Sequence, residues 1–110
     1  MTEEQIKFVE HEAHKIFIRY GFVPVYVYYD ETFDWETTTS KMDLGESYER
    51  NSTYMRLTAV RGLGAFVIEF TDSLYHASRN GYEDTDLIPF RDPDWILSEF
   101  ERLLVKYYIK

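Results

Sequence analysis

The chain is acidic, rich in aromatic residues and free of cysteine, and these properties narrow what it can be. Its 110 residues are too few for two ordinary cores, and hydrophobic residues at 45% predict one folded domain spanning 1–110. Twenty acidic against twelve basic residues give a net charge of −8, which disfavours nucleic acid and anionic membranes as partners. Since the chain has no cysteine, no signal peptide and no membrane span in its sequence, we expect a cytoplasmic protein.

The first element predicted is a helix over residues 3–20. Thr2 and Gln5 fit a capping box, and Gly21 is well placed to end the helix. Apolar residues recur at helical spacing along one stripe. These residues are Ile6, Val9, Ala13, Ile16, Phe17 and Tyr20. The stripe predicts that the helix packs on a core.

Strands are predicted next. Alternation over residues 23–29 predicts a strand with apolar or aromatic residues on both faces. A shorter strand is expected around residues 33–37. The mostly polar segment 40–52 is expected to be the longest loop or an irregular hairpin end.

The second half of the sequence predicts two paired strands and two helices. Residues 54–59 alternate and residues 65–70 are largely apolar, so we expect antiparallel strands joined by the turn 61–64. A short helix is expected over residues 73–78. The segment Asn80-Gly81-Tyr82-Glu83-Asp84-Thr85-Asp86-Leu87-Ile88-Pro89-Phe90 is interpreted as a connector with solvated carboxylates.

A final helix is predicted to begin after Asp92-Pro93 and to run to about Tyr108. Its apolar stripe consists of Ile96, Phe100, Leu103, Leu104 and Tyr107. The expected order is α-β-β-β-β-α-α. We therefore predict an α+β fold, with a mainly antiparallel four-stranded sheet and the N-terminal and C-terminal helices packed on one face.

No motif for catalysis or metal binding is complete. In His11-Glu12-Ala13-His14 the second histidine comes one position too early for a zinc-hydrolase helix, and Lys15 occupies the required place. Both histidines lie off the apolar stripe, so we expect them to be solvated. Counted from Asp84, a calcium loop would need glycine where Pro89 stands. We therefore expect no enzyme, no cofactor and no metal site.

Acidic residues gather in two blocks, each beside aromatic residues. Residues 30–50 hold seven acidic and two basic residues, and residues 82–94 hold five acidic and one basic. Carboxylates around aromatic anchors are typical of protein interfaces. The candidate partner-binding residues are Asp30, Glu31, Asp34, Trp35, Glu36, Glu83, Asp84 and Asp86. A basic protein is the partner that this charge favours.

Residues 65–108 resemble the C-terminal half of small immunity proteins from bacterial polymorphic-toxin and contact-dependent inhibition systems. The similar segments are Ala65-Phe66-Val67-Ile68-Glu69-Phe70, Ser73-Leu74-Tyr75-His76-Ala77 and Tyr82-Glu83-Asp84-Thr85-Asp86-Leu87-Ile88-Pro89, followed by the last helix. The resemblance implies a non-catalytic protein that binds and occludes a cognate toxin, and the acidity of the chain favours a basic toxin domain as that partner. Two alternatives stay open: an acidic DNA-mimic or anti-defence protein, and a small structural or regulatory subunit.

Overall fold

The computed structural model describes residues 1–30, 41–73 and 83–109. The strand expected at 33–37 therefore lies outside the described residues. The same holds for the helix expected over 73–78, apart from Ser73.

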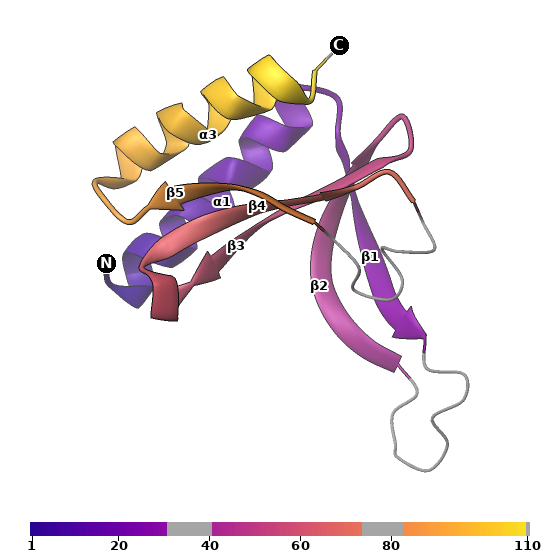
Figure 1. Ribbon diagram of the computed structural model, residues 1–110, viewed down its shortest axis with the longest axis horizontal. Helices are drawn as coiled ribbons and strands as arrows, with labels where there is room; N and C mark the ends of the chain where they lie inside the picture. The colour runs from indigo at the N-terminus through magenta and orange to yellow at the C-terminus, as the bar shows by residue number, and fades with distance from the viewer. Residues whose placement is uncertain (31–40, 74–82, 110) are drawn as a thin grey trace.

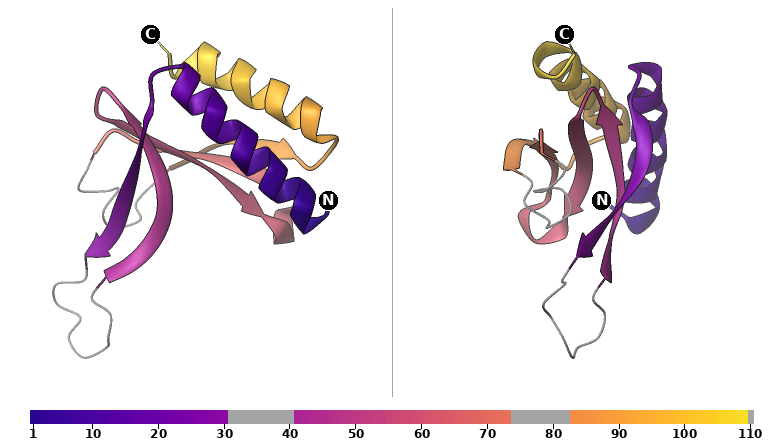
Figure 2. Two further views of the ribbon diagram at one scale, coloured as in Figure 1. Left: turned by 180° about the vertical axis from the view of Figure 1, so that it is seen from behind. Right: turned by 90° about the vertical axis from the view of Figure 1, so that its right-hand side faces the viewer.

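The fold is α+β, with two helices and a five-stranded antiparallel sheet in the described part of the chain. The elements are α1 (Glu3–Arg19), β1 (Val23–Asp30), β2 (Lys41–Arg50), β3 (Thr53–Val60), a 3-10 turn (Arg61–Leu63), β4 (Ala65–Thr71), β5 (Glu83–Pro89) and α3 (Pro93–Tyr107). The strands follow the chain in the order β1-β2-β3-β4-β5, and α1 and α3 cover one face (Figure 1). Figure 2 shows the far ends of β1 and β2 extending beyond the helices.

Two segments expected to be irregular are strands, so the predicted count of four strands is wrong. The expected loop 40–52 contains β2, which pairs with β1 on one side and with β3 on the other. The expected connector contains β5, where Ile88 pairs with Phe66 and Leu87 with Val67 of β4. Neighbouring strands supply the backbone hydrogen bonds, which allows polar residues to occupy these strands.

Helix α1 follows its sequence signals. The backbone N–H of Gln5 donates to Thr2 Oγ1 at 3.1 Å, and the Thr2 N–H donates to Gln5 Oε1 at 2.8 Å, which completes the predicted capping box. Gly21, after the helix, has a φ of +87°, which favours glycine. The predicted stripe is buried except at Tyr20, which is half-buried.

Helix α3 also begins as predicted, with Asp92 at the N-cap and Pro93 in the first turn. Within the described structure, the Asp92 carboxylate makes no capping hydrogen bond. Four members of the predicted stripe are buried, but Tyr107 is 52% exposed and was wrongly assigned to the core. Among the described residues, neither helix is long and apolar enough to cross a membrane.

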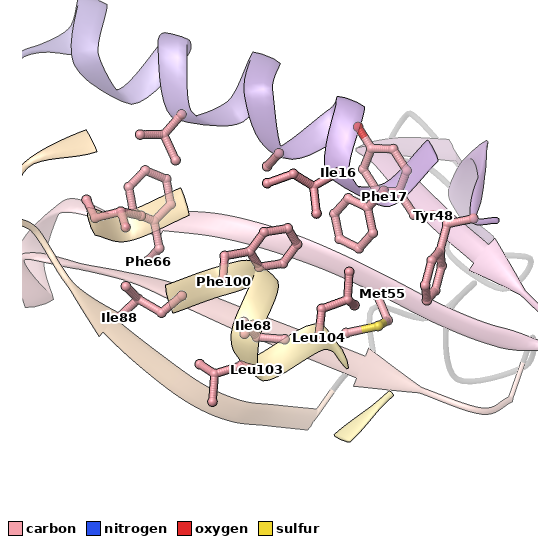
Figure 3. Packing of buried hydrophobic residues seen from close by; sticks show 14 of the residues in the cluster. Ile16, Phe17, Tyr48, Met55, Phe66, Ile68, Ile88, Phe100, Leu103 and Leu104 are labelled. Atoms are coloured by element: carbon pink, nitrogen blue, oxygen red, sulfur yellow. The ribbon is translucent and has the colours of Figure 1, made fainter. Parts of the chain in front are cut away.

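The core lies between the two helices and the sheet (Figure 3). Phe17 of α1 stacks on Tyr48 of β2 with ring centroids 4.0 Å apart, and it meets Phe100 of α3 edge-on at 5.0 Å. These contacts connect the first helix, the second strand and the last helix. Tyr48 thus anchors β2, the strand that the sequence did not predict.

The opposite face of the sheet carries a polar cross-strand pair. Arg56 of β3 lies directly opposite Glu69 of β4. Its Nε and Nη2 donate to the two carboxylate oxygens at 3.1 and 3.0 Å, and the Thr58 hydroxyl donates to the same carboxylate. The Arg56 and Glu69 side chains are only 13% and 14% exposed, so this ion pair is largely desolvated.

Candidate functional site

The described candidate residues of the two acidic blocks lie on opposite edge strands of the sheet. Asp30 ends β1, whereas Glu83, Asp84 and Asp86 belong to β5, and three strands separate β1 from β5. Four candidates lie outside the described residues. They are Glu31, Asp34, Trp35 and Glu36. The sheet therefore does not join the two blocks through neighbouring strands, and β5 is the block whose surroundings can be followed.

A register irregularity interrupts β5 in the middle of its acidic run. Asp86 pairs with Ile68 and Asp84 with Glu69, which leaves Thr85 as an extra residue. The Thr85 hydroxyl donates to the Ile68 carbonyl at 3.2 Å and accepts a hydrogen bond from the Tyr108 hydroxyl at 2.5 Å. The bulge thus ties the edge strand to the end of α3.

Beside this bulge lies a pocket of about 550 Å³, called here the C-terminal pocket. Its lining residues come from the end of α3, the β2–β3 turn, the end of β4, the residue after β4 and the start of β5. Aromatic and carboxylate side chains line it together. They are Phe70, Asp72, Glu83, Tyr107 and Tyr108. Of the predicted candidates, Glu83 lines this pocket; it is exposed, whereas Asp86 is half-buried.

The charges around the C-terminal pocket favour a cation. Asp72 and Glu83 are exposed, and neither makes a hydrogen bond or ion pair in the described structure. The positive charge of Arg50, which also lines the pocket, opposes the two negative charges. The Arg50 side chain also reaches Gly21, where a Cβ atom added to the glycine would lie 3.5 Å from Arg50 Nε. The last carbonyl groups of α3 add the negative end of the helix dipole at Tyr107.

Three rings, those of Phe70, Tyr107 and Tyr108, form the aromatic wall of the C-terminal pocket. Phe70 and Tyr108 lie with centroids 5.6 Å apart, and Tyr107 meets Tyr108 edge-on at 6.4 Å. Burial raises the pKa of Tyr108 above its usual value, so its hydroxyl stays protonated at neutral pH. Lys106 Nζ lies 5.1 Å from the Tyr107 centroid, a distance at which a ring attracts a cation.

Four of the five aromatic and carboxylate residues that line the C-terminal pocket are not among the predicted candidates: Phe70, Asp72, Tyr107 and Tyr108. Phe70 belongs to a predicted strand, and Tyr107 to the predicted apolar stripe of the last helix. Tyr108 was interpreted only as the end of the helix.

A second pocket, of about 420 Å³, lies beside α1. Its lining includes His11, His14, Glu10 and Tyr48. His14 is half-buried and its Nδ1 lies 2.9 Å from the Tyr48 hydroxyl, so the expectation that His14 is solvated is wrong. The strand β2, absent from the prediction, brings that hydroxyl to the helix. Among the residues described, no group of three or more metal-ligating side chains is placed to hold an ion.

Comparison with protein-family models, with curated proteins and with solved structures finds no match.

Proposed function

We propose that this chain is a non-catalytic binding protein, an immunity protein that neutralises a basic bacterial toxin by occluding its active cleft. The observation that carries the proposal is the C-terminal pocket, where the unpaired carboxylates of Asp72 and Glu83 lie beside the exposed ring of Tyr107. Tyrosine anchors and carboxylates together suit a basic protein surface.

The charge of the whole chain supports the same proposal. A net charge of −8 attracts a basic cleft over a distance and accelerates association, most strongly at low ionic strength. Toxins that act on nucleic acid need such basic clefts. The resemblance of residues 65–108 to immunity proteins adds a separate reason for this class.

The edge strand argues against the alternative of a subunit that self-associates through its sheet. Charges, a bulge and proline are features that protect an exposed edge from pairing. β5 carries Glu83 and Asp86, the irregularity at Thr85, and Pro89 at its end. In an antiparallel pair of two β5 strands centred on Asp86, the two Asp86 carboxylates would lie opposite each other, which is unfavourable. We therefore assign the acidic residues of β5 to partner binding and edge protection together.

A protection assay tests the proposal. A toxin domain encoded beside the gene for this chain is expressed in bacterial cells with and without it, and growth should recover only in its presence. The purified proteins should form a 1:1 complex in size-exclusion chromatography with light scattering. The association rate should fall by about tenfold or more between low and high salt.

Matched variants connect the assay to the site. Glu83→Gln removes one charge at the C-terminal pocket, and Glu4→Gln removes one from an exposed position of α1. We expect Glu83→Gln to weaken the complex and Glu4→Gln to leave it nearly unchanged. Absence of both protection and complex formation contradicts the proposal. A complex with a DNA-binding protein that DNA displaces would instead favour the DNA-mimic class.

A further inference from the structure

We propose that the C-terminal pocket is a binding site for a guanidinium group, and that its occupant is an arginine side chain of the partner protein. The partner's identity rests on the proposed function, whereas the chemistry of the pocket does not. The lining combines two carboxylates, three aromatic rings and the end of a helix.

The aromatic wall favours a flat cation. Tyr107 is 52% exposed, and Phe70 and Tyr108 complete the wall behind it. A guanidinium is planar and weakly hydrated, so it stacks on such rings at a small desolvation cost. The chain uses this contact elsewhere, since the Arg91 guanidinium carbon lies 4.2 Å from the centroid of the Trp95 ring.

The carboxylates then select charge and orientation. Asp72 follows β4 and Glu83 begins β5, so the two groups reach the pocket from different elements. A guanidinium has five N–H donors in a fixed fork and can donate to more than one carboxylate, whereas an ammonium is a compact, strongly hydrated charge. Arg50 also lines the pocket and repels a cation, but the two carboxylates outweigh its single positive charge.

An anion and a purely apolar ligand both fit this lining poorly. An anion would meet Asp72, Glu83 and the carbonyl end of α3. An apolar ligand would leave the carboxylates without a partner and gain no charge-assisted hydrogen bond. A pocket of about 550 Å³ lies in the range of ordinary ligand sites and accommodates the stem of an arginine as well as its head.

A titration with blocked amino acids tests the proposal without any partner. ¹⁵N-labelled protein is titrated with N-acetyl-arginine amide, N-acetyl-lysine amide and N-acetyl-citrulline amide, the last being a neutral analogue of similar shape. The arginine probe should shift the amide signals of Glu83, Tyr107 and Tyr108 with a dissociation constant on the order of 1 mM. The lysine probe should bind severalfold more weakly, and the citrulline probe should not saturate.

Single variants show whether the pocket is responsible. Glu83→Gln should weaken the arginine probe by about fivefold, the upper range for an exposed ion pair. Tyr107→Leu should weaken it by about two- to fivefold through the lost ring face. Both side chains are exposed, so both variants should fold, and unchanged amide signals outside the pocket verify this. Glu4→Gln is the matched charge control and should bind like the original chain.

The outcomes separate this inference from the proposed function. Equal binding of the arginine, lysine and citrulline probes, or equal affinity of Glu83→Gln and Glu4→Gln, overturns the guanidinium site. Such a result leaves a toxin complex possible through another surface. Selective arginine binding together with no toxin protection supports the pocket and contradicts the immunity proposal.

Discussion

Replacing Glu69 by glutamine should destabilise the fold by about 3 kcal/mol, because it removes the carboxylate charge that pairs with the largely buried Arg56 guanidinium. Glutamine keeps the shape of the side chain, so the loss is mainly electrostatic. Breaking a buried ion pair costs about 3–5 kcal/mol, and the remaining exposure of 13% and 14% places this pair at the lower end.

A second pair of the same geometry provides the control. Arg61 donates through Nε and Nη2 to the two carboxylate oxygens of Glu3, but these side chains are 57% and 61% exposed. Water and salt screen this pair, so Glu3→Gln should change stability little. The two variants make the same chemical change and differ in burial.

Urea unfolding measured by circular dichroism gives the comparison. With a slope of about 1.5 kcal/mol per molar, the midpoint of Glu69→Gln should fall by about 2 M. The double variant Arg56→Met with Glu69→Leu should recover most of the loss, because neither charge then remains buried. Midpoints that are equal for Glu69→Gln and Glu3→Gln would refute the reasoning.

Two further predictions concern the core and the C-terminal pocket. Phe100→Ala should lower the free energy of unfolding by about 3–5 kcal/mol in the same urea assay, because the ring is fully buried against Phe17; a loss below about 1 kcal/mol would contradict this packing. Burial raises the pKa of Tyr108 above its ordinary value of about 10. The stability that the protonated Tyr108 hydroxyl contributes is therefore fully present below pH 10 and is lost as pH rises through the folded-state pKa. The free energy of unfolding of Tyr108→Phe should therefore fall less steeply than that of the original chain as pH rises above 10. Equal pH dependence of the two proteins would contradict this prediction.

In the part of the chain that the structure describes, the sequence by itself determined both helices and three of the five strands. The stripe of α1 and the stripe of α3 are periodic within single segments, and caps such as Thr2 need only neighbouring residues. Alternating or continuous apolar residues likewise predicted β1, β3 and β4. These signals are local, so they are readable without knowledge of the fold.

Only the tertiary structure decided β2, β5 and the C-terminal pocket. Lys41–Arg50 and Glu83–Pro89 are polar enough to resemble loops, and they become strands because β1, β3 and β4 supply their hydrogen bonds. Glu83 was predicted as a candidate, but its neighbours Asp72 and Tyr107 come from distant elements. Strand register and helix packing bring them together, and a sequence pattern contains neither.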